Sequence, residues 1–172
     1  VKEINGETYV FHSTDYSRLT GWQTVGSQKY YLDTEGKAKT GWFQIDDYWY
    51  YGKEDGTVAI GLVDLPYENA TKTYYFDSKY RLQTGWQKVN GQTYYFESGE
   101  DPKECYRTNE ELEVKPGWLE LENGQTSYMN SKKSIVTGWQ TINKQRFYFD
   151  TKGFLKTGWF EVSKKHYYAE PE

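Results

Sequence analysis

Flat aromatic side chains recur at a regular spacing along this chain, and they are the residues whose type and pattern point to a chemical role. A Gly-Trp pair occurs six times, and its tryptophans are Trp22, Trp42, Trp86, Trp118, Trp139 and Trp159. An aromatic pair follows most of them, as in Tyr30-Tyr31 and Tyr50-Tyr51. Because indole and phenol rings stack on sugar faces and attract cations, the pattern indicates non-covalent recognition of a sugar or a cation.

Residues that carry out catalysis are sparse by comparison. His12 and His166 lie near opposite ends of the chain, and neither has a nucleophile pattern beside it. Asp33 and Asp150 occupy turn positions, where a carboxylate bonds the local backbone. Cys105 is the single cysteine, so no internal disulfide can form. No Gly-rich phosphate loop or metal-spaced His/Cys cluster occurs, and we therefore predict no enzyme activity, no catalytic or metal-binding residues and no cofactor.

The aromatic residues belong to a repeat of about twenty residues. Successive units begin 20, 20, 24, 32, 21 and 20 residues apart when Gly61-Leu62 is counted in place of one Gly-Trp pair. A turn such as Asn90-Gly91 separates two β-forming runs in each unit, which is a strong hairpin signal. An aliphatic residue stands four positions after each glycine, and we interpret this column as core: Val25, Ile45, Leu65, Val89, Leu121, Ile142 and Val162.

A fixed period of this length is typical of an array or solenoid. A single hairpin is marginal in water, whereas stacked hairpins bury their faces against one another. We therefore predict an all-β fold, an elongated solenoid of stacked β-hairpins forming a single array over residues 1–172. The expected units are a partial repeat at 1–20, repeats at 21–40, 41–60, 61–84, 85–116, 117–137 and 138–157, and a partial repeat at 158–172.

Composition narrows the range of partners. The net charge is −4, from 21 basic and 25 acidic residues, and the charges are interspersed. Without a basic stripe we expect no nucleic-acid binding, and without an apolar run near 18 residues we expect no membrane insertion. There is no signal peptide, and the chain begins inside a unit. We interpret it as a piece of a larger protein. The near-absence of cysteine fits a bacterial protein that is extracellular or attached to the cell surface.

One sequence motif resembles that of a known family. It begins with Thr-Gly-Trp-Gln, continues with Val or Ile and then Asn or Gly, and ends with an aromatic pair. It occurs at residues 84–96 and, with small changes, at 20–32 and 137–149. It is similar to the cell-wall-binding or choline-binding repeat superfamily, and the pattern stands nearest to its glucan-binding and clostridial-toxin members. The resemblance implies a β-hairpin solenoid with a non-catalytic binding role, and it leaves the ligand open.

In choline-binding members the resemblance implies a three-sided aromatic cage. Its walls are the Gly-Trp tryptophan, an aromatic residue just before the aromatic pair, and a tyrosine of the next hairpin. The residues before the pair are here Lys29, Trp49, Thr73, Thr93, Ser127, Arg146 and His166. We expect one such cage at most, built from Trp42, Trp49 and Tyr74 or Tyr75, because a cation disfavours lysine or arginine in its cage.

Three functions follow from these residues. The first is a carbohydrate-binding module for an α-glucan such as starch or dextran, with Trp49 and Tyr67 foremost because they break the repeat. Its other candidate residues are Trp42, Tyr74, Trp22, Trp86, Gln87, Trp139 and Gln140. The second is anchoring to choline-bearing or other cell-wall polymers. The third is a protein-interaction or spacer segment, with the insertions at 64–72 and 97–116 as contact loops.

The candidates have a purely structural alternative. The Gly-Trp tryptophans can pack one hairpin on the next. Gln87 and Gln140 directly follow a tryptophan along a strand, and neighbouring residues of a strand point to opposite faces. These glutamines are therefore expected to share no face with the adjacent indole.

Overall fold

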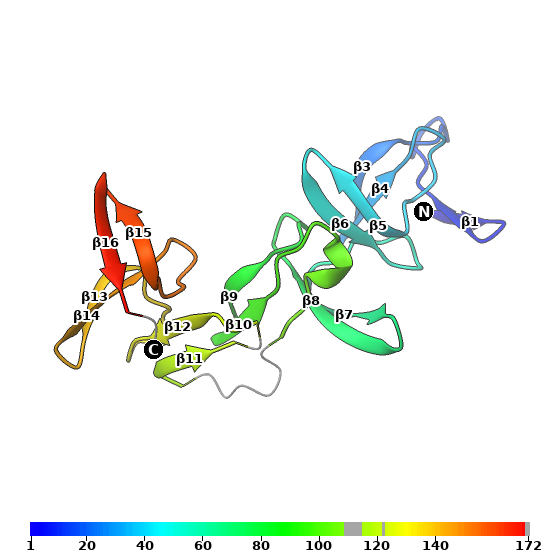
Figure 1. Cartoon of the computed structure of the whole chain (residues 1–172). Helices are drawn as coiled ribbons and strands as arrows, with labels where there is room; N and C mark the ends of the chain where they lie inside the picture. Colours follow the sequence, from blue (N-terminus) through cyan, green and yellow to red (C-terminus); the bar gives the residue numbers. More distant parts are fainter. Residues whose placement is uncertain (109–114, 122, 171–172) are drawn as a thin grey trace. The chain divides into compact units, whose positions relative to one another are not determined.

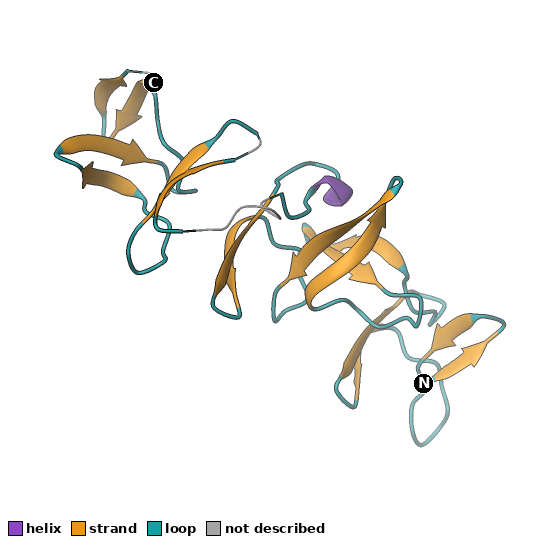
Figure 2. Ribbon diagram, turned by 90° about the horizontal axis from the view of Figure 1, so that it is seen from below, coloured by secondary structure: helices purple, strands orange, loops and turns teal. Residues whose placement is uncertain are grey.

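A computed structural model describes residues 1–108, 115–121 and 123–170, and the described chain is a succession of two-stranded antiparallel hairpins (Figure 1). The pairs are β1 (Lys2–Ile4) with β2 (Glu7–Tyr9), β3 (Gly21–Val25) with β4 (Gln28–Leu32), β5 (Gly41–Ile45) with β6 (Tyr48–Gly52), β7 (Gly61–Tyr67) with β8 (Ala70–Phe76), β9 (Gly85–Val89) with β10 (Gln92–Phe96), β11 (Gly117–Glu120) with β12 (Thr126–Met129), β13 (Gly138–Ile142) with β14 (Gln145–Phe149), and β15 (Gly158–Val162) with β16 (Lys165–Ala169). A short 3₁₀ turn, η1 (Pro102–Glu104), completes the described elements (Figure 2). The predicted all-β fold of stacked hairpins is confirmed.

The chain forms two compact units. Unit 1 comprises Val1–Gln83 and Ser98–Tyr106, and unit 2 comprises Thr84–Glu97 and Arg107–Glu172. Part of the insertion predicted at 97–116, residues 109–114, lies outside the described residues. The repeat boundaries and the single array stay predictions.

The turns explain why the strands pair as they do. Asn90 and Gly91 both have positive φ, +52° and +82°, as a two-residue hairpin turn requires. The insertion predicted at 64–72 was expected to lengthen a hairpin loop, and that prediction is wrong. Instead β7 and β8 grow to seven residues each, and Pro66 pairs with Thr71 inside the ladder. Proline is tolerated there because each strand of a two-stranded hairpin has an outer edge that needs no N–H donor.

Neighbouring hairpins are joined through their backbones. In four hairpins the carbonyl of a residue in the second strand accepts a hydrogen bond from the segment that follows the next hairpin. The pairs are Ala38 N to Thr8 O, Val58 N to Lys29 O and Leu82 N to Trp49 O at 2.8 Å, and Leu155 N to Thr126 O at 2.7 Å. Because these bonds use main-chain atoms, stacking tolerates different side chains at those positions.

The core runs along the inner ends of the second strands. In five hairpins the first glycine of the unit pairs with a large apolar residue that is at most 1% exposed: Leu32, Phe76, Phe96, Met129 and Phe149. In the predicted aliphatic column, Leu65, Val89, Leu121 and Ile142 are buried, as expected. Val25 is 37% exposed, so the column is not core throughout.

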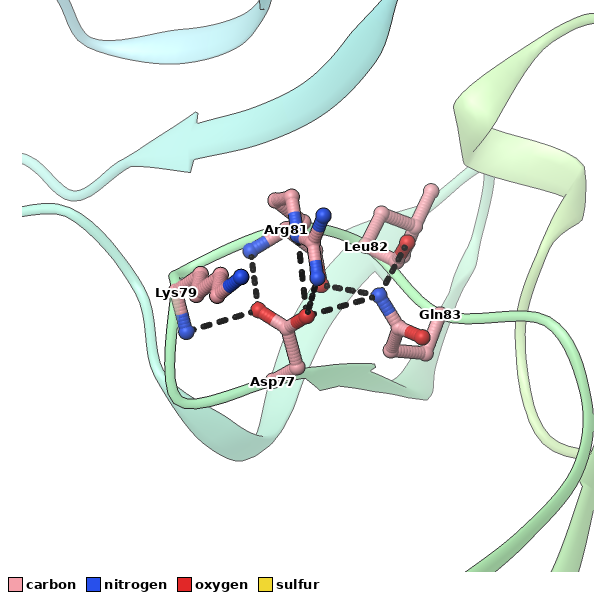
Figure 3. Close-up of polar contacts among 5 residues, drawn as sticks. All are labelled: Asp77, Lys79, Arg81, Leu82 and Gln83. Atoms are coloured by element: carbon pink, nitrogen blue, oxygen red, sulfur yellow. Dashed lines mark hydrogen bonds and ion pairs between the residues drawn. The ribbon is translucent and has the colours of Figure 1, made fainter.

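Asp77 organises the turn after β8 and shows how a carboxylate stabilises this fold (Figure 3). Its Oδ1 accepts from the backbone N–H groups of Lys79 and Arg81 at 2.8 and 3.0 Å. Its Oδ2 accepts from Nη2 of Arg81 at 2.7 Å and from Nε2 of Gln83 at 3.2 Å. The Arg81 guanidinium in turn lies 4.6 Å from the Tyr48 ring, so the turn is tied to the preceding hairpin.

This cluster predicts an acid-sensitive contribution to the stability of unit 1. Burial opposes ionisation of Asp77, but the hydrogen bonds from Arg81 and Lys79 outweigh it and lower the pKa of Asp77 below its usual value. A depressed carboxyl pKa adds stability above the unfolded value of about 3.9, and that stability is lost as the pH falls below it. Asp77→Asn should cost about 1–3 kcal/mol at pH 7 and flatten the acid limb of stability between about pH 5 and pH 2.

Chemical denaturation across this pH range measures both effects. Asp33→Asn is the matched control, since Asp33 accepts from the backbone N–H groups of Glu35 and Lys37 in the same kind of turn. There the side chain at the Arg81 position, Lys37, pairs with Glu7 instead. Equal losses for the two asparagine variants would contradict the assigned role of the guanidinium.

Candidate functional site

The register of each hairpin brings a Gly-Trp tryptophan and one other side chain together on one face. In β3–β4, Trp22 pairs with Tyr31 and Thr24 pairs with Lys29, so all four share a face. We call the residue in the place of Lys29 the cage position. It is Lys29, Trp49, Thr73, Thr93, Thr126, Arg146 or His166 in successive hairpins.

The fifth of these corrects the sequence alignment. The sequence pattern put Ser127 at the cage position, with Tyr128-Met129 departing from the aromatic pair that follows it in the other units. The ladder pairs Trp118 with Tyr128, so Thr126 holds the cage position and Ser127 replaces the first aromatic residue. Consistent with this, the Trp86 indole N–H donates to Ser127 Oγ at 3.2 Å.

For four tryptophans, the first aromatic residue of the next hairpin closes the cage on a second side. The ring centroids lie 5.0 Å apart for Trp22 and Tyr50, 5.2 Å for Trp42 and Tyr74, 4.9 Å for Trp118 and Phe147, and 4.9 Å for Trp139 and Tyr167. These tryptophans therefore do pack hairpin on hairpin. Trp159 has no such partner in the described chain and is 77% exposed.

Two cages hold a cation of the chain itself. Lys29 Nζ lies 4.9 Å from the centroid of Trp22 and 5.0 Å from that of Tyr80. Arg146 Cζ lies 4.5 Å from the centroid of Trp139. These distances are within cation–π range, so in these two cages a positive charge lies against the face of the tryptophan.

The Trp42 cage differs because its cage position carries a second indole. Trp49 shares the face of Trp42 and Tyr51 by register, and both tryptophans are half-buried. Within the described residues, no lysine or arginine is recorded over either of these two rings. Register and the Trp42–Tyr74 ring contact thus place Trp42, Trp49 and Tyr74 in adjacent hairpins as expected. Their role as a cation cage stays a prediction.

Tyr74 is the inner support of this cage rather than an exposed wall. It is 0% exposed, and its hydroxyl donates to Lys103 O at 2.6 Å. Burial raises the pKa of Tyr74 well above its ordinary value. The insertion that contains η1 therefore locks the tyrosine, and with it the position of the Trp42 ring.

Tyr67, the other leading candidate, joins the same aromatic cluster by way of Tyr106. The Tyr67 and Tyr106 centroids are 5.3 Å apart, and Tyr106 lies 6.4 Å from Tyr74. Lys72 Nζ lies 4.6 Å from the Tyr106 ring. Burial raises the pKa of Tyr67 as well, in keeping with a ring packed at the edge of this cluster.

The predicted glutamines serve the backbone. Nε2 of Gln87 donates to Thr84 O and Nε2 of Gln140 donates to Thr137 O, each at 2.8 Å. Gln87 pairs with Tyr94 and lies on the face opposite Trp86. The structure therefore does not bring these glutamines together with the cage tryptophans.

Sequence reasoning missed Tyr80 and Tyr106 as cage-side rings. Tyr80 has φ +68° and occupies a turn position that is glycine at Gly36, Gly56 and Gly153. An aromatic residue in place of a glycine with positive φ breaks the repeat, and this break could have marked Tyr80 as a candidate from the sequence alone. Tyr106 lies in the insertion, where no repeat exists to reveal it.

The described residues also bear on metal binding and on membrane crossing. No group of three or more His, Cys, Asp or Glu side chains is placed to hold a metal ion there. No helix in the same residues has the length and apolar character needed to cross a membrane. Cys105 is buried, and its sulfur accepts a hydrogen bond from the Gly99 backbone N–H at 3.4 Å.

Comparison with known proteins identifies the repeats. The family described as choline-binding repeat matches residues 19–61 and 136–171, and the putative cell wall binding repeat matches residues 84–100. No match was found among the curated proteins.

Solved structures of the same kind were also found. CbpJ from Streptococcus pneumoniae is 30% identical over 94% of this chain and 53% of its own, with a TM-score of 0.49. Choline binding protein F from Streptococcus pneumoniae is 32% identical over 91% of this chain and 51% of its own, with a TM-score of 0.45. The chain thus spans about half the length of these structures. On the strength of its matched repeats, the chain belongs to the choline-binding and cell-wall-binding repeat superfamily.

Proposed function

We propose that this chain is a non-catalytic module that attaches a bacterial surface protein to a choline-bearing cell-wall polymer. The observation that carries the proposal is the register of β5–β6, which puts a second indole, Trp49, at the cage position that Lys29 and Arg146 hold in other hairpins. The choline-binding repeat match at residues 19–61 includes this hairpin. We place one quaternary ammonium site between Trp42 and Trp49, supported from below by Tyr74.

The two filled cages give the physical reason. Lys29 and Arg146 place positive charge 4.9 and 4.5 Å from the centroids of Trp22 and Trp139. A quaternary ammonium at the equivalent place over Trp42 meets a second indole face, and each cation–π contact is worth about 0.5–2 kcal/mol according to its desolvation. One cage of this kind supports weak binding to free choline.

The α-glucan function stays a prediction, and it is now the second candidate. Trp49 and Tyr67 lie in hairpins of one unit, and Tyr67 connects to Trp42 through Tyr106 and Tyr74. The half-buried rings of Trp42, Trp49 and Tyr67 offer stacking surface to a sugar. The family matches favour choline because both name choline-binding or cell-wall-binding repeats.

Choline titration tests the proposal directly. Tryptophan fluorescence and calorimetry should report saturable binding of choline, and 3,3-dimethylbutanol, its uncharged analogue, should bind far less. Trp49→Ala should weaken choline binding about tenfold or more, the loss of one desolvated cation–π wall. Trp159→Ala is the matched control, since that ring is exposed and belongs to no closed cage.

Other results of these assays would contradict the choline proposal or support a different function. Equal binding of the uncharged analogue, or undiminished binding by Trp49→Ala, would rule out the Trp42 cage as a cation site. Retardation in amylopectin or dextran gels without any choline response would establish the α-glucan function. If neither choline nor a glucan binds detectably, a protein-interaction or spacer segment would be favoured.

A further inference from the structure

A groove lies against the second filled cage, in unit 2. It has a volume of about 590 Å³ and runs between β13–β14 and β15–β16. Its lining includes Trp139, Arg146, Tyr148, Lys156, Phe160 and Tyr167. A volume of this size accommodates one or a few sugar rings.

The same ring arrangement occurs in both filled cages, which makes them a matched pair. In unit 2, the rings of Tyr148 and Phe160 are stacked at 5.4 Å, and those of Phe160 and Tyr167 at 5.8 Å. In unit 1, Tyr31, Phe43 and Tyr50 form the equivalent stack, with centroid distances of 5.5 and 5.6 Å. Trp22 and Trp139 stand at the same place beside these stacks.

The two cages differ in what covers the resident cation. Lys29 is half-buried between Trp22 and Tyr80. Arg146 is exposed, lies on Trp139 alone and forms part of the groove wall. The unit 1 cation is thus enclosed by its own chain, whereas the unit 2 cation faces a cavity.

A guanidinium that lies over an indole can still bind an anion. The contact with the ring leaves the N–H donors available, and their planar fork matches carboxylate or phosphate oxygens. Among the described residues, no carboxylate is recorded within ion-pair distance of Arg146. The second cation of the groove, Lys156, lies 3.9 Å from Asp150, a long and weak pairing.

We propose that this groove binds a saccharide that carries a carboxylate or a phosphate. Arg146 receives the anionic group, Lys156 adds long-range attraction, and the rings beside Trp139 contact the sugar face. Glu170 also lines the groove and opposes an anion, leaving one net positive charge in the described lining. The site lies in another unit and takes the opposite charge from the choline cage, so it does not depend on the proposed function.

Binding of defined anionic and neutral sugars tests this assignment. The probes are a glucuronic acid oligomer and glucose 1-phosphate, with a glucose oligomer as the neutral reference. Calorimetry and the NMR signal of the Trp139 indole N–H give affinity and location. We expect an anionic probe to bind with marked salt dependence and the neutral oligomer to bind about tenfold or more weakly.

Variants that change the charge of the groove test whether Arg146 is responsible for anion binding. Arg146→Gln should weaken binding of the anionic probe about tenfold or more, Arg146→Lys should recover it in part, and Glu170→Gln should strengthen it. Lys144→Gln is the matched control, because Lys144 is exposed near Arg146 and lies outside the groove lining. Equal binding of neutral and anionic sugars, or identical behaviour of Arg146→Gln and Lys144→Gln, would overturn the proposal. The response to uronate against phosphate separates the two sources of negative charge.

Discussion

Gly52→Ala is expected to destabilise unit 1 by about 3 kcal/mol or more, which is the upper range for overpacking a closed site. A Cβ added at Gly52 would lie 1.9 Å from Lys39 O, 2.8 Å from Lys39 C and 2.9 Å from Thr40 Cα. All three neighbours are backbone atoms of the segment before β5, so no side-chain rotation relieves the overlap. Urea denaturation and amide hydrogen exchange of β5 and β6 measure the loss.

Gly26→Ala provides the matched control for backbone strain. Gly26 has φ +62°, and nothing lies within 4 Å of its added Cβ. That variant should lose only the cost of a left-handed alanine, about 1–2 kcal/mol. Similar losses for both variants would show that the segment before β5 moves aside, and the close packing at Gly52 would then be unimportant.

Gly52 is also a residue that the repeat pattern does not predict. The equivalent residue is large and buried in five other hairpins, Leu32, Phe76, Phe96, Met129 and Phe149. A consensus built from the repeats would therefore place an apolar side chain at Gly52. Only the close approach of Lys39 explains why glycine stands there, and that contact is invisible in a periodic pattern.

Hairpins and turns were predictable because their signals are local. Asn90-Gly91 specifies its turn, and the Gly-Trp and aromatic-pair columns specify the two strands. The same method failed where the repeat loses a residue type. With one aromatic residue missing beside Tyr128, the pair was assigned one position too late, and a one-residue shift reverses every face.

The cages were only partly predictable for a related reason. Trp42, Trp49 and Tyr74 were expected together, since they come from adjacent hairpins in regular positions. Tyr80 and Tyr106 come from a turn and an insertion, and their contacts with the cages are set by stacking geometry. Lys29 and Arg146 were interpreted as residues that exclude a ligand cation, whereas the structure shows each one occupying its cage.

Lys29→Ala is expected to open a second ammonium site. The change removes both the charge and its aliphatic stem from between Trp22 and Tyr80, while Tyr50 keeps packing against Trp22. Losing a half-buried cation–π contact should cost unit 1 about 1–2 kcal/mol in free energy of unfolding. A free quaternary ammonium can then take the vacated place, so calorimetry with tetramethylammonium should detect one more site than in the parent chain.

Two variants decide whether the vacancy is specific. Lys29→Arg keeps a cation in the cage and should gain no site, and Lys88→Ala removes an exposed lysine beside Thr93 without emptying a cage. Saturating tetramethylammonium should also restore part of the stability of Lys29→Ala, because a ligand that binds only the folded state stabilises it. If Lys29→Ala loses stability and gains neither site nor rescue, the walls of the Trp22 cage close together when the cation leaves. Lys29 would then have a structural role only. The presence of Trp49 at the cage position would be the one feature that separates a binding cage from tryptophan packing between hairpins.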